Sequence, residues 1–179
     1  MSKVDPRAAA FLARLDEVEG RLRRHASSAP APGLTDPDPP TGEQWDAGQV
    51  WAHLGEFLPY WAAQVRVVVD PSGEEPVPFG RTKTDPGRVA AIERDRRLPA
   101  EELMGRITGQ IEEVRALIAE LPTEAWGRRG LHPTLGVMDL PGIFEEFLVG
   151  HLESHAEQLD ALRGEGPTDA LASQHTKEP

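Results

Sequence analysis

Apolar residues recur at steps of three and four along four stretches of the chain, which is the spacing of one face of an amphipathic helix. This pattern predicts helices over residues 6–25, 45–69, 99–120 and 140–163. Proline stands in the first turn of the first and last of these, at Pro6 and Pro141, and an aspartate able to cap each helix precedes it. Four helices with one apolar stripe each predict an all-α fold, a four-helix bundle.

Stretches without apolar periodicity separate the expected helices. Residues 27–42 are rich in proline and are expected to be a surface loop, as are residues 70–87 and 121–138. Residues 88–97 could form a short helix or an extended segment. Because the connections after the first two helices are long, we expect a bundle with crossover-type loops and no strand of length. We assign residues 1–164 to the bundle and residues 165–179 to a flexible tail.

The last predicted helix carries two histidines, His151 and His155, within its apolar stripe. Residues four apart lie on the same side of a helix, so the two imidazoles can converge on one point. An H-x-x-x-H pair that faces a core is a familiar way to present two nitrogen ligands to a metal. The alternative is a pair of histidines at the core edge, hydrogen-bonded to carbonyl groups or to Gln158.

A third histidine, His53, flanks the apolar stripe of residues 45–69. Three imidazoles from two helices can hold one divalent ion and leave coordination positions open. Pro59, in the same helix, removes the hydrogen bond to the carbonyl of Gly55, so we expect a bent helix rather than two separate ones. The remaining histidines are interpreted as solvated or locally hydrogen-bonded: His25, His132 and His175.

The bulk properties exclude several classes of protein. The net charge of −11, with no basic block, argues against nonspecific nucleic-acid binding and against attachment to anionic membranes. The chain contains no run of 18 apolar residues, so we expect no transmembrane helix. The N-terminus lacks a signal-peptide pattern. The absence of cysteine excludes disulfides and thiolate ligands and favours a cytoplasmic protein.

Two segments resemble the DinB-like (DinB/YfiT) superfamily. Residues 43–66, EQWDAGQVWAHLGEFLPYWAAQVR, are similar to its second helix, and residues 126–163 are similar to its closing segment, with HLESHAEQL at 151–159 matching H-x-x-x-H-x-x-Q-L. The resemblance implies a four-helix bundle that binds zinc, nickel, iron or a similar ion through His53, His151 and His155. It also implies kinship with mycothiol-dependent maleylpyruvate isomerases, although the tight histidine spacing is closer to the DinB core group.

The function that follows is a metal-dependent enzyme acting on a small-molecule substrate. The ion would lower the pKa of water or of an external low-molecular-weight thiol, giving a hydrolase or a thiol S-transferase. The sequence identifies no general base. The competing hypotheses are a non-enzymatic bundle or homodimer in which the histidines or the metal are structural, and a metal-responsive or small-molecule-binding protein.

Residues around the three histidines receive weaker assignments. Glu56, one turn after His53, is the best candidate for a residue that contacts a metal ligand without binding the metal itself. Glu153 and Glu157 are expected to be solvated charges on the opposite face. Three arginines could hold an anionic substrate group, although a surface role is favoured: Arg94, Arg96 and Arg97. Three aromatic residues are assigned to the core: Trp51, Tyr60 and Trp61.

Overall fold

The structure, a computed structural model, describes residues 5–164. Its helices are α1 (Pro6–Ala26), α2 (Ala47–Val69), α3 (Pro86–Asp95), α4 (Ala100–Glu120), α5 (Leu140–Phe147) and α6 (Val149–Leu162). Three short strands, β1 (Val77–Pro78), β2 (Arg129–His132) and β3 (Gly136–Asp139), and one turn of 3-10 helix, η1 (Thr123–Gly127), complete it. The predicted tail and His175 lie outside the described residues.

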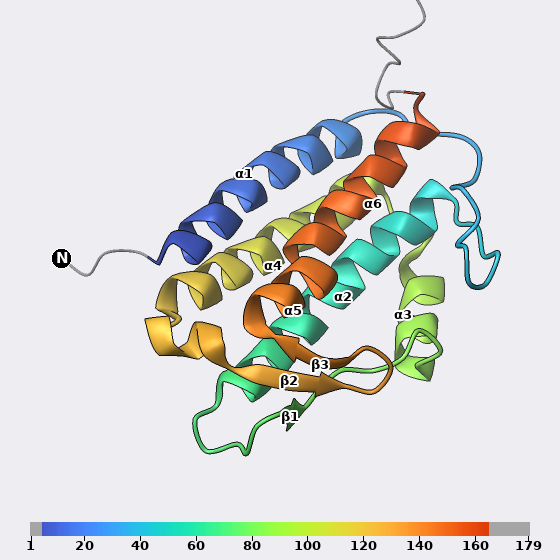
Figure 1. Cartoon of the computed structure of the whole chain (residues 1–179). Coiled ribbons are helices and arrows are strands. Elements are labelled where there is room, and N and C mark those ends of the chain that lie inside the picture. The colour runs from blue at the N-terminus through green and yellow to red at the C-terminus, as the bar shows by residue number, and fades with distance from the viewer. Residues whose placement is uncertain (1–4, 165–179) are drawn as a thin grey trace, which may run out of the picture.

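The long helices form the predicted four-helix bundle, with α5 and α6 together making the fourth member. In Figure 1, α1 and α6 run in one direction while α2 and α4 run in the other. Both α1 and α2 pack against α4 and α6, so α1 and α2 occupy opposite corners of the bundle. The chain therefore crosses over one end between α1 and α2, which confirms the crossover-type connection.

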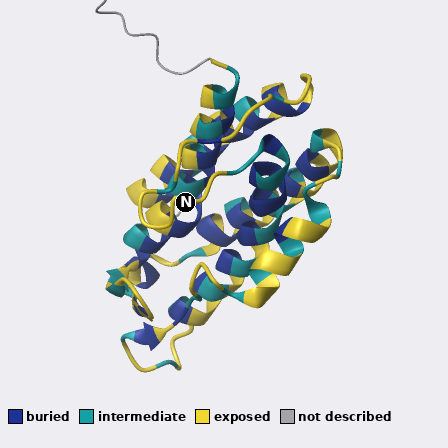
Figure 2. Ribbon diagram, turned by 90° about the vertical axis from the view of Figure 1, so that its right-hand side faces the viewer, coloured by how far each residue is buried: buried dark blue, intermediate teal, exposed yellow. Residues whose placement is uncertain are grey.

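The predicted apolar stripes meet in the interior of the bundle. Figure 2 shows the buried residues facing inward and the exposed ones on the outer faces of the helices. Each long helix contributes fully buried side chains, among them Leu15, Leu54, Phe57, Ile107, Ile111, Phe144 and Leu152. Burial of these stripes is the main force that assembles the helices, because isolated helices of this length are marginal in water.

Aspartate caps fix where several helices begin. Asp5 accepts a hydrogen bond from the backbone of Arg7 at the start of α1. Asp46 and Gln49 form a reciprocal capping box at the start of α2, with contacts of 2.8 and 3.0 Å. The predicted helix starts near residues 6 and 46 are thus confirmed.

Helix α2 continues through Pro59 as one helix, as predicted. Proline has no amide hydrogen, so the carbonyl of Gly55 loses its usual helical partner. The side chain of Gln110, from α4, donates to that carbonyl at 2.9 Å. The neighbouring helix therefore satisfies the group that Pro59 leaves open, only two residues beyond His53.

The single helix predicted over residues 140–163 is wrong, because the chain breaks at Leu148 (φ −126°, ψ −86°) between α5 and α6. Just beyond the break, the backbone of Gly150 lies against the carbonyl oxygen of Glu145. A Cβ atom at residue 150 would overlap that oxygen, so only glycine allows this close approach. The break re-aims α6, and with it His151 and His155.

The segments predicted as loops contain a small sheet at one end of the bundle (Figure 1). Strands β2 and β3 form an antiparallel hairpin, and β1 pairs with β2 in parallel. Strands of two to four residues are too short to show a period-two pattern in the sequence. The ambiguous stretch near residues 88–97 is helix α3, with Asp85 accepting from the Arg88 amide at 2.9 Å. No helix among the described residues has the length and apolar character to cross a membrane.

Candidate metal centre

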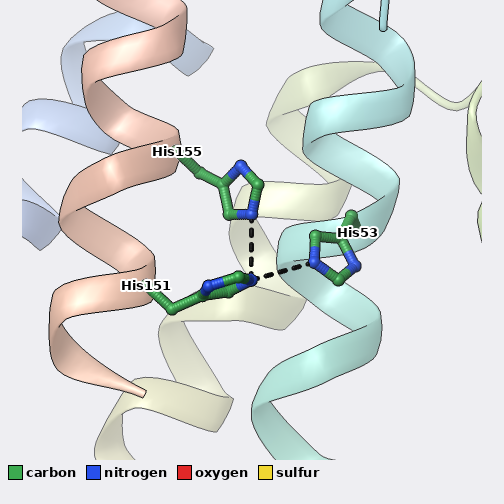
Figure 3. A group of neighbouring side chains, drawn as sticks. All are labelled: His53, His151 and His155. Carbon is green, nitrogen blue, oxygen red and sulfur yellow. Dashed lines mark hydrogen bonds between the residues drawn. The ribbon is translucent and has the colours of Figure 1, made fainter. Parts of the chain in front are cut away.

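The three histidines singled out in the sequence meet between α2 and α6. His53 extends from α2, and His151 and His155 extend from successive turns of α6 toward it (Figure 3). The Nε2 atom of His151 lies 3.1 Å from Nε2 of His53 and 3.1 Å from Nε2 of His155. Nitrogen atoms 98 residues apart in the chain thus converge on one point.

The spacing of these nitrogen atoms fits a shared ion. With metal–nitrogen bonds of about 2.05 Å, two ligands of a tetrahedral ion lie about 3.3 Å apart, and adjacent ligands of an octahedral ion about 2.9 Å apart. The observed 3.1 Å lies between these values. Among the described residues, no fourth histidine, aspartate or glutamate joins this group. The arrangement therefore resembles an open three-ligand site rather than a closed structural one.

Neighbouring side chains fix which nitrogen of each ring faces inward. The Nδ1 atom of His155 lies 2.7 Å from Oε1 of Gln158, an amide oxygen that can only accept. The Nδ1 atom of His53 lies 3.4 Å from Oε2 of Glu56. The Gln158 contact places a proton on Nδ1 of His155 and leaves a lone pair on its Nε2 atom, whereas the contact of His53 with Glu56 is not a hydrogen bond. One proton on Nε2 of His151 can serve only one of its two neighbours at 3.1 Å, and a cation bound by all three Nε2 atoms would satisfy them together.

Glu56 is held by a second contact behind His53. Its Oε1 atom forms a short ion pair with Arg81, whose guanidinium lies 3.8 Å from the centre of the Tyr60 ring. Glu56 is largely buried, and its Oε2 atom makes no hydrogen bond in the described structure. The carboxylate is thus anchored by Arg81 with one oxygen available to His53, the arrangement that orients histidine ligands in many metal sites.

Burial keeps all three imidazoles neutral near pH 7. Desolvation lowers the pKa of His53 and of His151 well below 6.5, and the positive charges of His155 and Arg88 lower the pKa of both further. Desolvation also lowers the pKa of His155 to about 4, against an opposing effect from Gln158. Neutral imidazole is the form that binds a metal, so the site is prepared for an ion without first losing protons.

The histidines lie at the base of a cleft of about 950 Å³. One wall is the proline-rich connection at residues 35–39. The Thr35 amide donates to the Trp45 carbonyl at 2.8 Å, and the Trp45 amide donates to the Thr35 hydroxyl at 3.0 Å, which joins this connection to the start of α2. The ring of Trp45 stacks on His155 at 6.1 Å and meets His53 edge-on at 5.2 Å. The volume is that of a site for a small molecule.

Two other histidines differ from their predicted, solvated state. His25 is buried, and its Nε2 atom lies 2.5 Å from Asp160. His132 is buried at the end of β2, where its Nε2 atom lies 3.2 Å from the carbonyl oxygen of Arg81. Both are locally hydrogen-bonded, which was the second half of that prediction, and both lie apart from the metal candidates.

The charged residues near the site are only partly those expected. Arg94 and Arg96 pair with carboxylates outside the cleft, and Glu153 is bound by Arg14 rather than freely solvated. Glu157 is exposed but lines the cleft, which the helical spacing did not predict. The cationic part of the lining comes from three residues that no sequence pattern groups together: Arg21, Lys83 and Arg88.

Comparisons with known proteins agree with this architecture. The sequence pattern of the DinB superfamily matches residues 14–159. Among solved structures, YfiT from Bacillus subtilis, described as a probable metal-dependent hydrolase with an unusual four-helix bundle topology, superimposes with a TM-score of 0.69. It shares 16% sequence identity, and the match covers 90% of this chain and 89% of that one. The comparison with curated proteins finds no match.

Proposed function

Since the chain belongs to the DinB superfamily, we propose that it binds one divalent metal ion through His53, His151 and His155 and hydrolyses a small-molecule substrate beside it. The observation that carries this proposal is that the Nε2 atoms of His53 and His155 each lie 3.1 Å from Nε2 of His151, in the lining of an open cleft. An all-imidazole donor set suits zinc, nickel and iron, which remain the candidate ions.

Each part of the site has a role in this chemistry. When bound, the ion supplies Lewis acidity, which lowers the pKa of a nucleophile that enters the cleft and polarises the bond to be broken. Gln158 and Glu56 hold the histidine rings so that Nε2 faces the cleft. Phe57 packs edge-on against His151 at 4.7 Å and closes the apolar side of the site to water. The structural likeness to YfiT, described as a probable metal-dependent hydrolase, supports the choice of hydrolysis.

An external low-molecular-weight thiol is the second nucleophile that this site could use. The chain has no cysteine, so any thiol must arrive from solution. A cleft of about 950 Å³ is large enough for a thiol and an electrophile together. Thiol transfer is therefore the alternative reaction at the same site, with the same three ligands.

A purely structural metal is the alternative outside catalysis. A structural metal ion that joins helices normally has four protein ligands. Among the described residues three candidate ligands occur here, and they line a cleft. The homodimer suggested by the sequence would be consistent with either role, and sedimentation of the full-length protein would test it.

The test begins with metal content. Protein purified without a nickel column should contain about one equivalent of a divalent ion, and chelation should remove both the ion and the activity. A panel of esters and amides, tested with and without cysteine-derived thiols, separates hydrolysis from thiol transfer. A protein that takes up no zinc, nickel or iron when these are added would refute the proposal.

A further inference from the structure

Arg88 stands out among the cations of the cleft because it has no carboxylate partner within ion-pair distance among the described residues. Its guanidinium donates one hydrogen bond, of 2.8 Å, to the backbone carbonyl of Lys83. Arginine carries five N–H donors in a planar fork, so most of them remain available. Arg88 is also partly buried, and desolvation lowers its pKa, although the carboxylates of Glu56, Glu43 and Asp85 act in the opposite direction without forming an ion pair with it.

The two neighbouring cations are already neutralised. Lys83 lies 3.3 Å from the carboxylate of Asp38, and Arg21 lies 2.5 Å from that of Asp160. The cleft thus holds two cations paired within the protein and a third, Arg88, that forms no ion pair within residues 5–164. Placing a charge in a partly desolvated position without a partner costs stability, which suggests selection for a ligand.

The ring of Trp45 links Arg88 to the three histidines. The guanidinium of Arg88 lies 5.4 Å from the centre of that ring, and the same ring stacks on His155 at 6.1 Å. The cation is therefore no more than about 12 Å from the His155 ring. Its positive charge also lowers the pKa of all three histidines, which is consistent with this proximity.

We propose that Arg88 binds an anionic oxyacid group, a carboxylate or a phosphate, on the substrate of this site. The proposal rests on the function proposed above, because it supposes that the same molecule reaches the three histidines. The substrate class is an ester or amide with an acidic group a few atoms from the carbonyl carbon. Hydrolysis adds one water across the bond and releases a carboxylic acid with an alcohol or amine, so no further reactant is needed.

Arginine suits this role better than lysine would. Its fork can donate two parallel hydrogen bonds to a carboxylate or phosphate, and this fixes the orientation of the group as well as its position. With the anion held near Trp45, the uncharged remainder of the substrate would extend toward the floor of the cleft. Arg88 is in this account a specificity-determining residue, which binds a part of the substrate that does not react.

Binding of small anions to the full-length protein, with and without added zinc, tests the proposal independently of turnover. Calorimetric titration with succinate and with inorganic phosphate should show binding to the wild type that weakens about tenfold or more in Arg88→Gln. Arg94→Gln is the matched control, because Arg94 lies on the same helix but pairs with Asp95 away from the cleft. Whichever anion binds more tightly identifies the group as carboxylate or phosphate. Equal binding to wild type and Arg88→Gln, or no binding to either, would overturn the proposal.

Turnover provides the second readout. The zinc-loaded wild type should hydrolyse mono-4-nitrophenyl succinate in preference to 4-nitrophenyl acetate. Arg88→Gln should lose this preference mainly through a higher KM for the succinate ester, whereas Arg94→Gln should keep it. Arg88→Lys should restore part of it, and thermal unfolding should show that both variants fold. If anions bind through Arg88 but no ester is hydrolysed, the proposed function fails and the anion site stands. A succinate preference that survives in Arg88→Gln would overturn the inference.

Discussion

Two groups of buried histidines occur in this bundle, and they differ in what their nitrogen atoms face. His25 and His132 each direct Nε2 at an oxygen atom of the protein, 2.5 Å from Asp160 and 3.2 Å from the Arg81 carbonyl. His53, His151 and His155 instead direct Nε2 at one another. His25 and His132 are as buried as His53 and His155, and His151 is half-buried, so burial alone does not indicate a metal site. The orientation of the nitrogen atoms does.

The two groups differ because of the hydrogen-bond partners available to their Nε2 atoms. A histidine that faces a carboxylate or a carbonyl is satisfied by donating one proton, and it stabilises the fold as any buried polar pair does. Three Nε2 atoms that face one another cannot all be satisfied by their own protons. The first group is satisfied within the protein, whereas the proposed ion would satisfy the second.

The largest effect should come from removing one member of the second group. His151→Ala should weaken zinc binding more than about a hundredfold, because a direct ligand is worth more than the 10- to 100-fold of an outer-shell residue. His132→Ala should leave zinc affinity within about twofold but lower the thermal midpoint, since the His132 ring packs against Phe147 at 4.9 Å. Zinc titration and thermal unfolding of both variants measure this. A similar loss of zinc affinity in both would erase the distinction between the groups.

The pH dependence of the metal-free protein should report the burial of the second group. The pKa of His155 is about 4 in the folded chain against about 6.5 in the unfolded one, so the unfolded chain takes up the proton first as pH falls. The free energy of unfolding should therefore drop as pH falls from about 6.5 to 4, by about 3 kcal/mol for this residue. Denaturant unfolding at several pH values measures the slope, and His155→Gln should reduce it. An unchanged slope in that variant would contradict the assigned burial effect.

The bundle and the three histidines could be predicted because each depends on spacing along a helix. The steps of three and four identified the helices, and the four-residue interval placed His151 beside His155. Their joint role as metal ligands stays a prediction. The residues that contact these histidines were harder to predict from the sequence. Glu56 could be identified because it lies one turn from His53. Arg81 could not, because it reaches Glu56 from a loop 25 residues later in the chain.

The other features that the sequence did not predict share one cause: each depends on contacts in the tertiary structure. Arg88 and Trp45 belong to different segments, and only the packing of α3 and the proline-rich connection brings both beside the histidines. The helix break at Leu148 depends on a backbone contact between Gly150 and Glu145 that periodicity does not reveal. The sequence contained one signal of this break, a glycine one residue before the candidate ligand His151. Only the structure shows that this glycine permits the close backbone contact at the break.

That glycine provides the next prediction. Gly150→Ala should lower the free energy of unfolding by about 2 kcal/mol and weaken zinc binding as well, because the new methyl group would force Glu145 and the start of α6 apart and move His151. Gly105→Ala is the control: Gly105 is an exposed helical glycine with open space around it, so the change should add about 0.5–1 kcal/mol. Denaturant unfolding and zinc titration distinguish the two. A Gly150→Ala protein with wild-type stability and zinc affinity would show that the break does not aim the ligands.

The smallest expected effect tests whether Glu56 orients the His53 ring through its Nδ1 atom. Glu56→Gln keeps the size of the side chain but removes the charge that favours a proton on Nδ1 of His53, so zinc affinity should fall by about tenfold. Glu153→Gln removes a carboxylate from α6 that is bound to Arg14, and it should leave zinc affinity unchanged. Because Glu56→Gln also weakens the pair with Arg81, the unfolding free energy of each variant is measured without metal and compared with the zinc affinity. If both variants bind zinc as the wild type does, Glu56 only anchors Arg81, and the orientation of His53 depends on its packing against Trp45 and Phe57.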